Sequence, residues 1–197
     1  MKKNKKSELK NLIEVTKRKE RIKKEHVDIK WIITIVITSF IISFGLSFVS
    51  QTTIPNLSLW IGIIITLLFI LLGIIFDIIG VSVTAADEAV FHSMNSRKVK
   101  GASTAVMFKK NSDKVSNFCC DVVGDVCGII SGAAGTTITA ILVETYKFNL
   151  LLTGLTIASI IAALTIGGKA IGKSFAINKS DIILYEFAKF ISNFYNK

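Results

Sequence analysis

The sequence has one proline, three cysteines and, between Trp31 and Phe76, no charged residue. Three cysteines are few and odd in number, which excludes a disulfide scaffold, and the long apolar runs exclude intrinsic disorder. The chain does have 51% hydrophobic residues, a mean hydropathy of +0.57 and a net charge of +10. Because soluble domains rarely combine such hydropathy with such charge, the two must be segregated along the chain. This indicates a membrane protein, and no nucleic acid is needed to explain the basic excess.

Four segments are apolar enough and long enough to cross a bilayer. The charge-free run is divided at 52–58, where the only proline predicts a turn, so it contains two spans at about 31–50 and 59–81. Further apolar segments at about 116–143 and 149–168 predict a third and a fourth span. About 20 helical residues cover the roughly 30 Å of hydrocarbon. We therefore expect an all-α integral membrane protein with a four-helix transmembrane domain at residues 31–173.

The basic residues predict how these spans are oriented. Residues 1–30 hold 12 Lys and Arg, the connection at about 91–115 holds six, and the chain from Lys169 onward holds five. The other two connections hold only Lys147. Lys and Arg that flank short loops stay on the cytoplasmic side of the membrane. We therefore expect a multi-pass protein of the cell membrane, with both termini and the 91–115 connection in the cytoplasm.

The segments outside the spans are short and amphipathic. Residues 7–27 have apolar residues at helical spacing and predict a surface helix within a basic segment, residues 1–30, that binds anionic lipid headgroups. The C-terminal segment, residues 174–197, predicts a second amphipathic helix beginning at Ser180. Its apolar face collects Ile183, Phe187, Phe190, Ile191 and Phe194. This helix either lies in the membrane interface or packs on the cytoplasmic ends of the bundle.

Three carboxylates lie within the predicted spans. Asp77 is near the cytoplasmic end of the second span, and Asp121 and Asp125 are one and two turns into the third. An aspartate at the centre of a membrane helix costs on the order of 3 kcal/mol, so it must be paired, hydrated or bound to a cation. Asp77 and Asp121 are close enough to the interface to be hydrated or to pair with Lys98 or Lys114. Asp125 lies deeper, and we expect it to have a functional or ion-linked role.

Small residues recur at intervals of four on the third span. They are Cys120, Gly124, Gly128, Gly132 and Thr136. Such a stripe lets a second helix approach closely, and its simplest interpretation is packing within the chain or in a homodimer through the three glycines. The glycines also expose backbone carbonyls beside Asp125. With hydroxyls from Ser82, Thr84 and Ser131, these oxygens would suit a hard cation.

No enzyme motif is visible. The sequence has no phosphate-binding glycine loop, no HExxH and no GxSxG, and its two histidines, His26 and His92, have no nucleophile constellation around them. The cysteines lack metal-finger spacing, so we interpret them as buried thiols. We therefore do not expect an enzyme.

Two short motifs resemble the transmembrane domain of the CNNM/CorC family, the CorB-type magnesium and cobalt transporters. Residues 83–94 (VTAADEAVFHSM) resemble a family motif of the form S-A-S-E-x-A, with Thr84 and Asp87 at its first and fourth positions. Residues 123–128 (VGDVCG) resemble its I-G-N motif, with Asp125 in place of the asparagine. The resemblance covers about 59–168, and the remaining length leaves no room for the family's cytoplasmic CBS-domain pair.

This resemblance implies magnesium or cobalt transport or binding, with the cation held by helix oxygens in a homodimer. Together with the carboxylates it predicts a Mg²⁺ or Co²⁺ site between the second and third spans. The expected ligands and flanking groups are Asp77, Ser82, Thr84, Asp87, Asp121, Gly124, Asp125 and Gly128. Two alternatives stay open: a small oligomerising, holin-like membrane protein, and an accessory membrane protein without transport activity.

Overall fold

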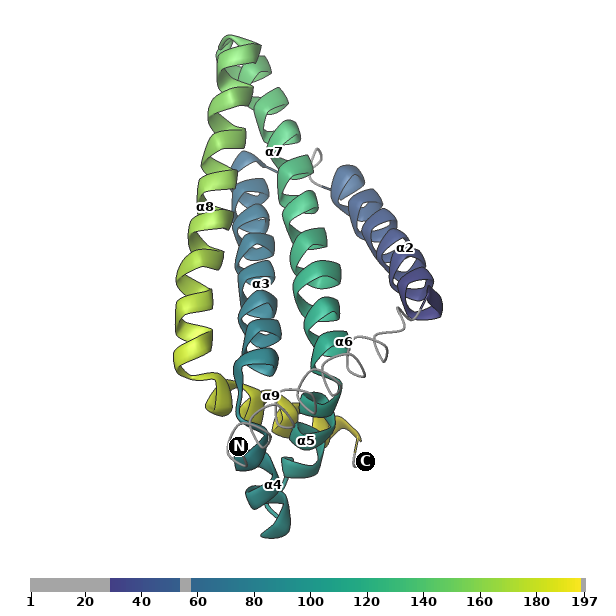
Figure 1. The fold of residues 1–197 in the computed structure, drawn as a ribbon. Coiled ribbons are helices and arrows are strands. Elements are labelled where there is room, and N and C mark those ends of the chain that lie inside the picture. Colours follow the sequence, from purple (N-terminus) through teal and green to yellow (C-terminus); the bar gives the residue numbers. More distant parts are fainter. Residues whose placement is uncertain (1–28, 54–57, 196–197) are drawn as a thin grey trace, which may run out of the picture. The chain divides into compact units, whose positions relative to one another are not determined.

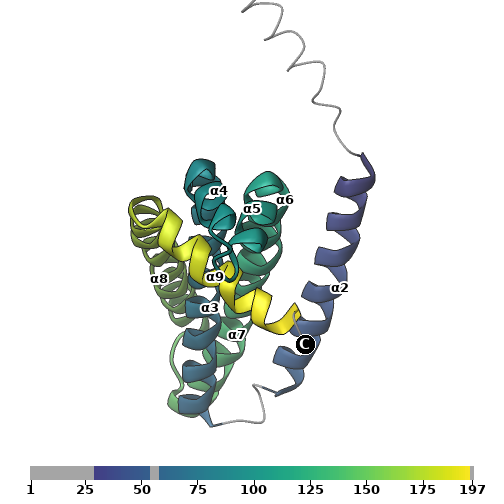
Figure 2. The ribbon, with the colours of Figure 1, turned by 90° about the horizontal axis from the view of Figure 1, so that it is seen from below.

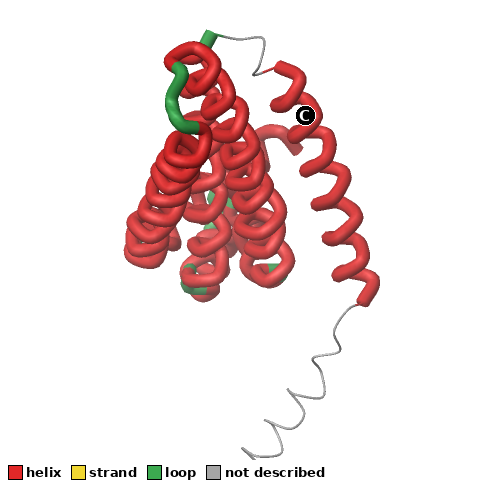
Figure 3. Tube along the Cα trace, turned by 90° about the horizontal axis from the view of Figure 1, so that it is seen from above, coloured by secondary structure: helices red, strands yellow, loops and turns green. Residues whose placement is uncertain are grey.

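The computed structural model describes residues 29–53 and 58–195, and every regular element in them is a helix. The predicted surface helix at 7–27 lies outside the described residues. The elements, in chain order, are α2 (Ile29–Thr53), α3 (Leu59–Ala85), α4 (Glu88–Ser96), α5 (Ala102–Lys110), α6 (Ser112–Asn117), the π-helix η2 (Phe118–Gly124), α7 (Asp125–Tyr146), α8 (Leu150–Asn178) and α9 (Ser180–Tyr195) (Figure 1). Figure 3 shows how short the loops between the helices from α3 to α9 are. The predicted all-α class is confirmed.

In the described part of the chain, four helical stretches are long and apolar enough to cross a membrane. They are Ile29–Thr53, Leu59–Ala85, Ser112–Tyr146 and Leu150–Asn178. Many of their large apolar side chains are exposed, including Trp60 on α3 and Leu155 on α8. A soluble protein rarely exposes so much apolar surface, whereas lipid accepts it. The four predicted spans are thus present as helices of a multi-pass membrane protein.

α2 is described by itself. Large apolar side chains lie exposed on it, among them Ile33, Phe40 and Phe44. Thr34 and Thr52 bond to carbonyls one turn back: the Thr34 hydroxyl donates to Lys30 O at 2.8 Å and the Thr52 hydroxyl to Phe48 O at 2.9 Å. Such back-bonding satisfies a hydroxyl without water, which a helix in lipid requires.

α3, α7 and α8 lie side by side and each contacts the other two (Figures 1 and 2). The side of α3 that packs inward has mostly small or polar residues: Gly62, Thr66, Ile70, Gly73, Asp77 and Gly80. A Cβ on Gly73 would lie 3.2 Å from the carbonyl oxygen of Gly124, and one on Gly80 would lie 3.1 Å from that of Ser116. Backbone therefore lies against backbone here, as is common between membrane helices.

The short helices α4 and α5 and the C-terminal helix α9 pack at one end of the bundle (Figure 2). A cluster of buried side chains joins them to the end of α3, and its members are Val83, Ala86, Phe91, Ala105, Val106, Leu184 and Ala188. Gly101 precedes α5 with φ 85°, and a Cβ there would lie 2.8 Å from Lys189 Cα. Of the two alternatives for α9, the structure therefore has it packed on the end of the bundle.

The buried face of α9 differs from the predicted one. The side chains of Leu184, Ala188 and Ser192 are buried, whereas Phe190 is exposed. The Phe187 ring, at the border of the buried face, packs on Phe108 with ring centroids 5.6 Å apart. Because Ala188 and Ser192 are small, α9 can approach α5 closely. The size of the side chains, rather than their hydrophobicity, therefore determines which face of α9 is buried. The side chain of Phe194 lies outside the described part.

Candidate functional site

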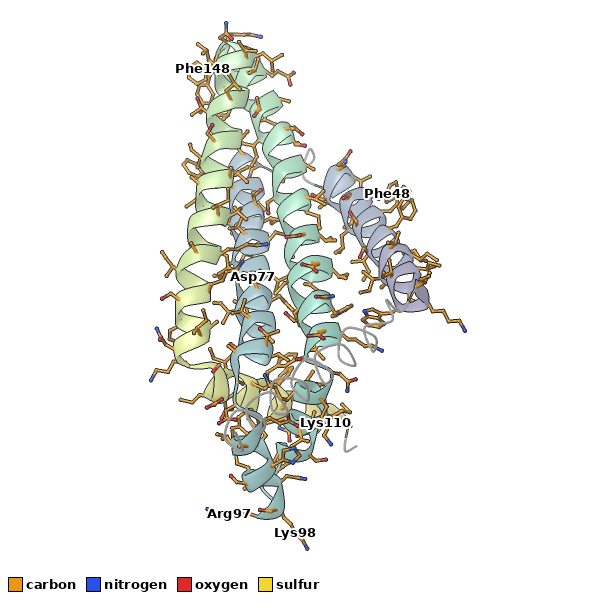
Figure 4. The ribbon with its side chains drawn as sticks, viewed as in Figure 1. Phe48, Asp77, Arg97, Lys98, Lys110 and Phe148 are labelled. Carbon is orange, nitrogen blue, oxygen red and sulfur yellow. The ribbon has the colours of Figure 1, made fainter. Side chains whose placement is uncertain are left out.

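Four charged side chains from three helices come together where α3, α7 and α8 pack against one another. Asp77 comes from α3, Asp125 from the start of α7, and Lys169 and Lys173 from α8; Figure 4 labels Asp77 among these helices. Lys169 Nζ lies 2.9 Å from Asp125 Oδ1 and 3.9 Å from Asp77 Oδ1. Lys173 Nζ lies 4.0 Å from Asp77 Oδ2. We call these four residues the charge centre.

The two carboxylates of the charge centre differ in exposure. The Asp77 side chain is 5% exposed and that of Asp125 is 63% exposed, with Lys169 between them at 20%. Asp77 Oδ2 has no hydrogen-bond partner among the described residues. The ammonium of Lys173 is too distant for a hydrogen bond, and a buried carboxylate oxygen without one is costly. Asp77 is therefore an incompletely satisfied anion at the inner side of the centre.

The local fold explains how Asp125 reaches α8. The π-helix η2 ends at Gly124, directly before Asp125. A Cβ on Gly124 would lie in ordinary contact, 3.6 Å from Gly73 O and 3.7 Å from Lys169 Nζ, so the backbone of Gly124 lies beside both α3 and the lysine. In the same π-helix Cys120 Sγ lies 3.7 Å from Asp77 O. π-helical turns within α-helices are frequent at functional sites.

The charges of the centre do not balance without Lys173. Two carboxylates face one close ammonium, that of Lys169, which leaves one negative charge. The Lys173 side chain is 55% exposed and 4.0 Å from its partner. Exposed pairs at such distances contribute little. The centre can therefore accept further positive charge.

Ser82, Thr84 and Asp87, three of the predicted site residues, make their hydrogen bonds outside the charge centre. The Ser82 hydroxyl donates to Ile78 O at 2.7 Å and is buried against α8. The Thr84 hydroxyl donates to Val81 O at 2.8 Å. Asp87 begins α4, where its Oδ1 accepts a hydrogen bond from Ala89 N at 3.0 Å.

These three residues lie toward or beyond the end of α3, one to three turns after Asp77, and their polar groups complete helix ends and turns. The Asp87 backbone N–H donates to Asp181 Oδ1 of α9 at 2.8 Å, and Lys109 Nζ donates to Thr84 O at 2.8 Å. The hydroxyls of Ser82 and Thr84 and the carboxylate of Asp87, expected as ligands, are thus engaged in hydrogen bonds outside the charge centre. The backbone groups at the end of α3 and the start of α4 require such hydrogen bonds, because a helix terminus leaves some of its N–H and C=O groups without partners in the helix.

The small residues of the third span have two different surroundings. Gly124 packs against α3, whereas a Cβ on Gly128 or Gly132 would meet nothing within 4 Å. These two glycines line an apolar groove of about 630 Å³ between α7 and α8. The predicted Ser131 ligand is buried and donates to Cys127 O at 2.8 Å. Asp121 is exposed and belongs to none of the ion pairs within the described residues.

Neither lysine of the centre was predicted as a site residue. Lys169 and Lys173 were expected on the cytoplasmic side after the fourth span, and Asp77 was expected to be hydrated or to pair with Lys98 or Lys114, but α8 continues to Asn178. Their spacing of four residues was the available signal, because it puts both ammonium groups on one face of a continued helix. Which carboxylate faces them depends on how α8 packs against α3.

Comparison with known proteins reveals no relative: no family model, no curated protein and no solved structure matches the chain. Within residues 29–53 and 58–195, no three His, Cys, Asp or Glu side chains come together to hold a metal ion. A function must therefore be argued from the charge centre and its surroundings.

Proposed function

We propose that the protein is a multi-pass membrane protein that binds and transports a divalent cation, Mg²⁺ or Co²⁺, at the charge centre. The observation that carries this proposal is the meeting of Asp77 and Asp125 from two helices, with the buried Asp77 Oδ2 lacking a hydrogen bond. Ionisable residues at membrane depth are costly and mark ion pathways and proton relays.

The geometry favours a cation that keeps part of its water. Mg²⁺ binds through one or two carboxylates and usually retains several water molecules. Asp77 and Asp125 supply the two carboxylates, and the exposure of Asp125 leaves room for water. The ligand set we propose is therefore smaller than the one expected from sequence, because Ser82, Thr84 and Asp87 are engaged elsewhere.

The resemblance to the CNNM/CorC family also supports a cation site at Asp125. The VGDVCG motif begins in the π-helix η2 and continues into α7, so Asp125 stands where the helix geometry changes. In the resemblance this position is an asparagine, a neutral ligand. An aspartate there adds a negative charge, which a divalent cation or a lysine must balance.

We place the α4–α5 end of the bundle in the cytoplasm. Arg97, Lys98 and Lys110 lie at that end and Phe148 at the opposite end (Figure 4). This arrangement agrees with the rule that basic residues stay inside. Asp77 is eight residues before the end of α3, about 12 Å by helix rise, so the cation would enter the site from the cytoplasmic half.

The test is a titration of Mg²⁺ and of Co²⁺ against the melting temperature of the purified protein in detergent. We expect the wild type to be stabilised by several degrees, because ligand binding to the folded state alone raises stability. Asp125→Asn should abolish the shift, and Asp121→Asn, one turn away and unpaired, is the matched control that should retain it. A wild type without an ion-dependent shift, or an Asp125→Asn variant with the full shift, overturns the proposal.

A second candidate function is a structural or membrane-permeabilising protein that oligomerises. The groove at Gly128 and Gly132 favours it, because it offers space for a helix of a second copy, as expected for a homodimer through these glycines. Induced expression would then permeabilise cells, and Gly128→Leu would abolish the effect by filling the groove. A cation carrier should instead leave the membrane intact.

A further inference from the structure

Lys169 occupies the space between the two carboxylates. Its ammonium bonds Asp125 Oδ1 at 2.9 Å and lies 3.9 Å from Asp77 Oδ1, and its side chain is only 20% exposed. A magnesium ion bound to the same Asp125 oxygen would lie about 2.1 Å from it. The lysine and such an ion compete for one position, because both need the same lone pairs.

The lysine fills this position incompletely. At 3.9 Å its ammonium is too distant for a hydrogen bond to Asp77, and Asp77 Oδ2 has no hydrogen-bond partner among the described residues. Although the ammonium has three N–H donors, in this structure it hydrogen-bonds Asp125 and not Asp77. A hydrated divalent cation can bind both carboxylates, since its ligand shell has several positions around one centre.

We propose that Lys169 is a tethered counter-ion, which neutralises one of the two carboxylate charges when no cation is bound and leaves the carboxylates when a divalent cation binds. This inference rests on the proposed function. It also assigns the site a preference for divalent ions. In the present state the two carboxylates and Lys169 sum to one negative charge.

The charge balance favours displacement over addition. A divalent cation that replaces Lys169 brings the pair of carboxylates to neutrality, whereas one that binds beside the lysine leaves an excess positive charge at a partly buried position. A monovalent ion that replaces the lysine leaves the net charge as it was and gains nothing. The flexible four-carbon stem lets the ammonium turn toward the end of α8, where the exposed Lys173 side chain already reaches solvent.

The test compares Mg²⁺ affinity, measured calorimetrically with MgCl₂ at constant K⁺, for three variants of the full chain. Lys169→Met removes the competing charge and should bind about tenfold tighter or more, because like charges this close repel strongly in partly buried surroundings. Lys169→Arg keeps the charge and its planar fork can bond both carboxylates, so it should bind more weakly than wild type. Lys179→Met removes an exposed lysine outside the centre and should leave the affinity unchanged.

Removing Lys169 leaves two carboxylates unpaired, so the Met variant is expected to be less stable in chelator and to recover in Mg²⁺. If it does not fold in either condition, Lys169→Arg decides: weaker Mg²⁺ binding supports the inference, and equal or tighter binding overturns it. A wild type that binds Mg²⁺ while Lys169→Met binds no tighter overturns the counter-ion role alone. Absence of Mg²⁺ and Co²⁺ binding in both proteins overturns the proposed function as well.

Discussion

The two halves of the third membrane helix have the same kind of sequence and different surroundings. Near its start, Gly124 lies against the backbone of Gly73 and beside Lys169. One and two turns further, Gly128 and Gly132 face an open apolar groove. Small residues thus serve two purposes on one helix. Near the start they let the backbone of α3 approach that of η2 beside Lys169, and further along they leave a surface unfilled.

The comparison can be tested with one substitution, glycine to alanine, at three positions. The added methyl group is the same in each case, so differences in the free energy of unfolding report what surrounds it. Each variant is measured as the purified protein in the same detergent, with and without Mg²⁺.

Gly73→Ala should have the largest effect. Its Cβ would lie 3.1 Å from Cys127 Cβ and 3.2 Å from Gly124 O, which is tighter than ordinary packing and partly against backbone. We expect a loss of about 2 kcal/mol, since overpacking a rigid contact forces the helices apart. Separation of α3 from α7 should also reduce the stabilisation by Mg²⁺. An unchanged melting temperature would show that the two helices are not in contact here.

Gly135→Ala should have an intermediate effect. Its Cβ would lie 2.5 Å from Cδ1 of Ile161, the flexible end of a side chain on α8. We expect a loss of about 1 kcal/mol, because a rotamer change can relieve most of the overlap. Mg²⁺ should stabilise this variant as much as it stabilises wild type. A smaller stabilisation by Mg²⁺ would mean that the outer half of α7 is coupled to the charge centre.

Gly128→Ala should have the smallest effect and the opposite sign. Nothing lies within 4 Å of its added Cβ, so the change should stabilise the helix by up to about 1 kcal/mol through helix propensity alone. Chemical crosslinking of the same sample measures self-association. A clear loss of stability at a concentration where wild type is dimeric would place a second copy in the groove, contradicting an open one.

Helix-forming segments could be predicted well because their signal is local. The absence of charge from Trp31 to Phe76 and the turn at the only proline predicted two long helices, and α2 and α3 span these positions. α9 begins at Ser180, as expected, yet the prediction of its buried face failed. Ala188 of α9 is buried in one cluster with Ala105 and Val106 of α5, and no property of α9 alone reveals these partners.

The candidate site could be predicted only in part. Asp77 and Asp125 stand out in any apolar run, since a carboxylate at membrane depth must have a partner. The lysine partners could not be recognised in the same way. Lys169 and Lys173 follow two glycines at the end of an apolar segment, where basic residues commonly flank a membrane span. Hydroxyls at Ser82 and Thr84 were expected as ligands, but both bond to carbonyls of their own helix.

The sequence by itself determined the class of this protein, because apolar runs of bilayer length and the places of charge along the chain follow from composition and order alone. Only the tertiary structure decided which charges meet. The pairing of Asp125 with Lys169 joins residues 44 positions apart. It depends on the close approach of backbones at Gly73 and Gly124 and on a π-helical turn directly before Asp125. Ion pairs form over a few ångströms, and distances of that size between helices are set by packing.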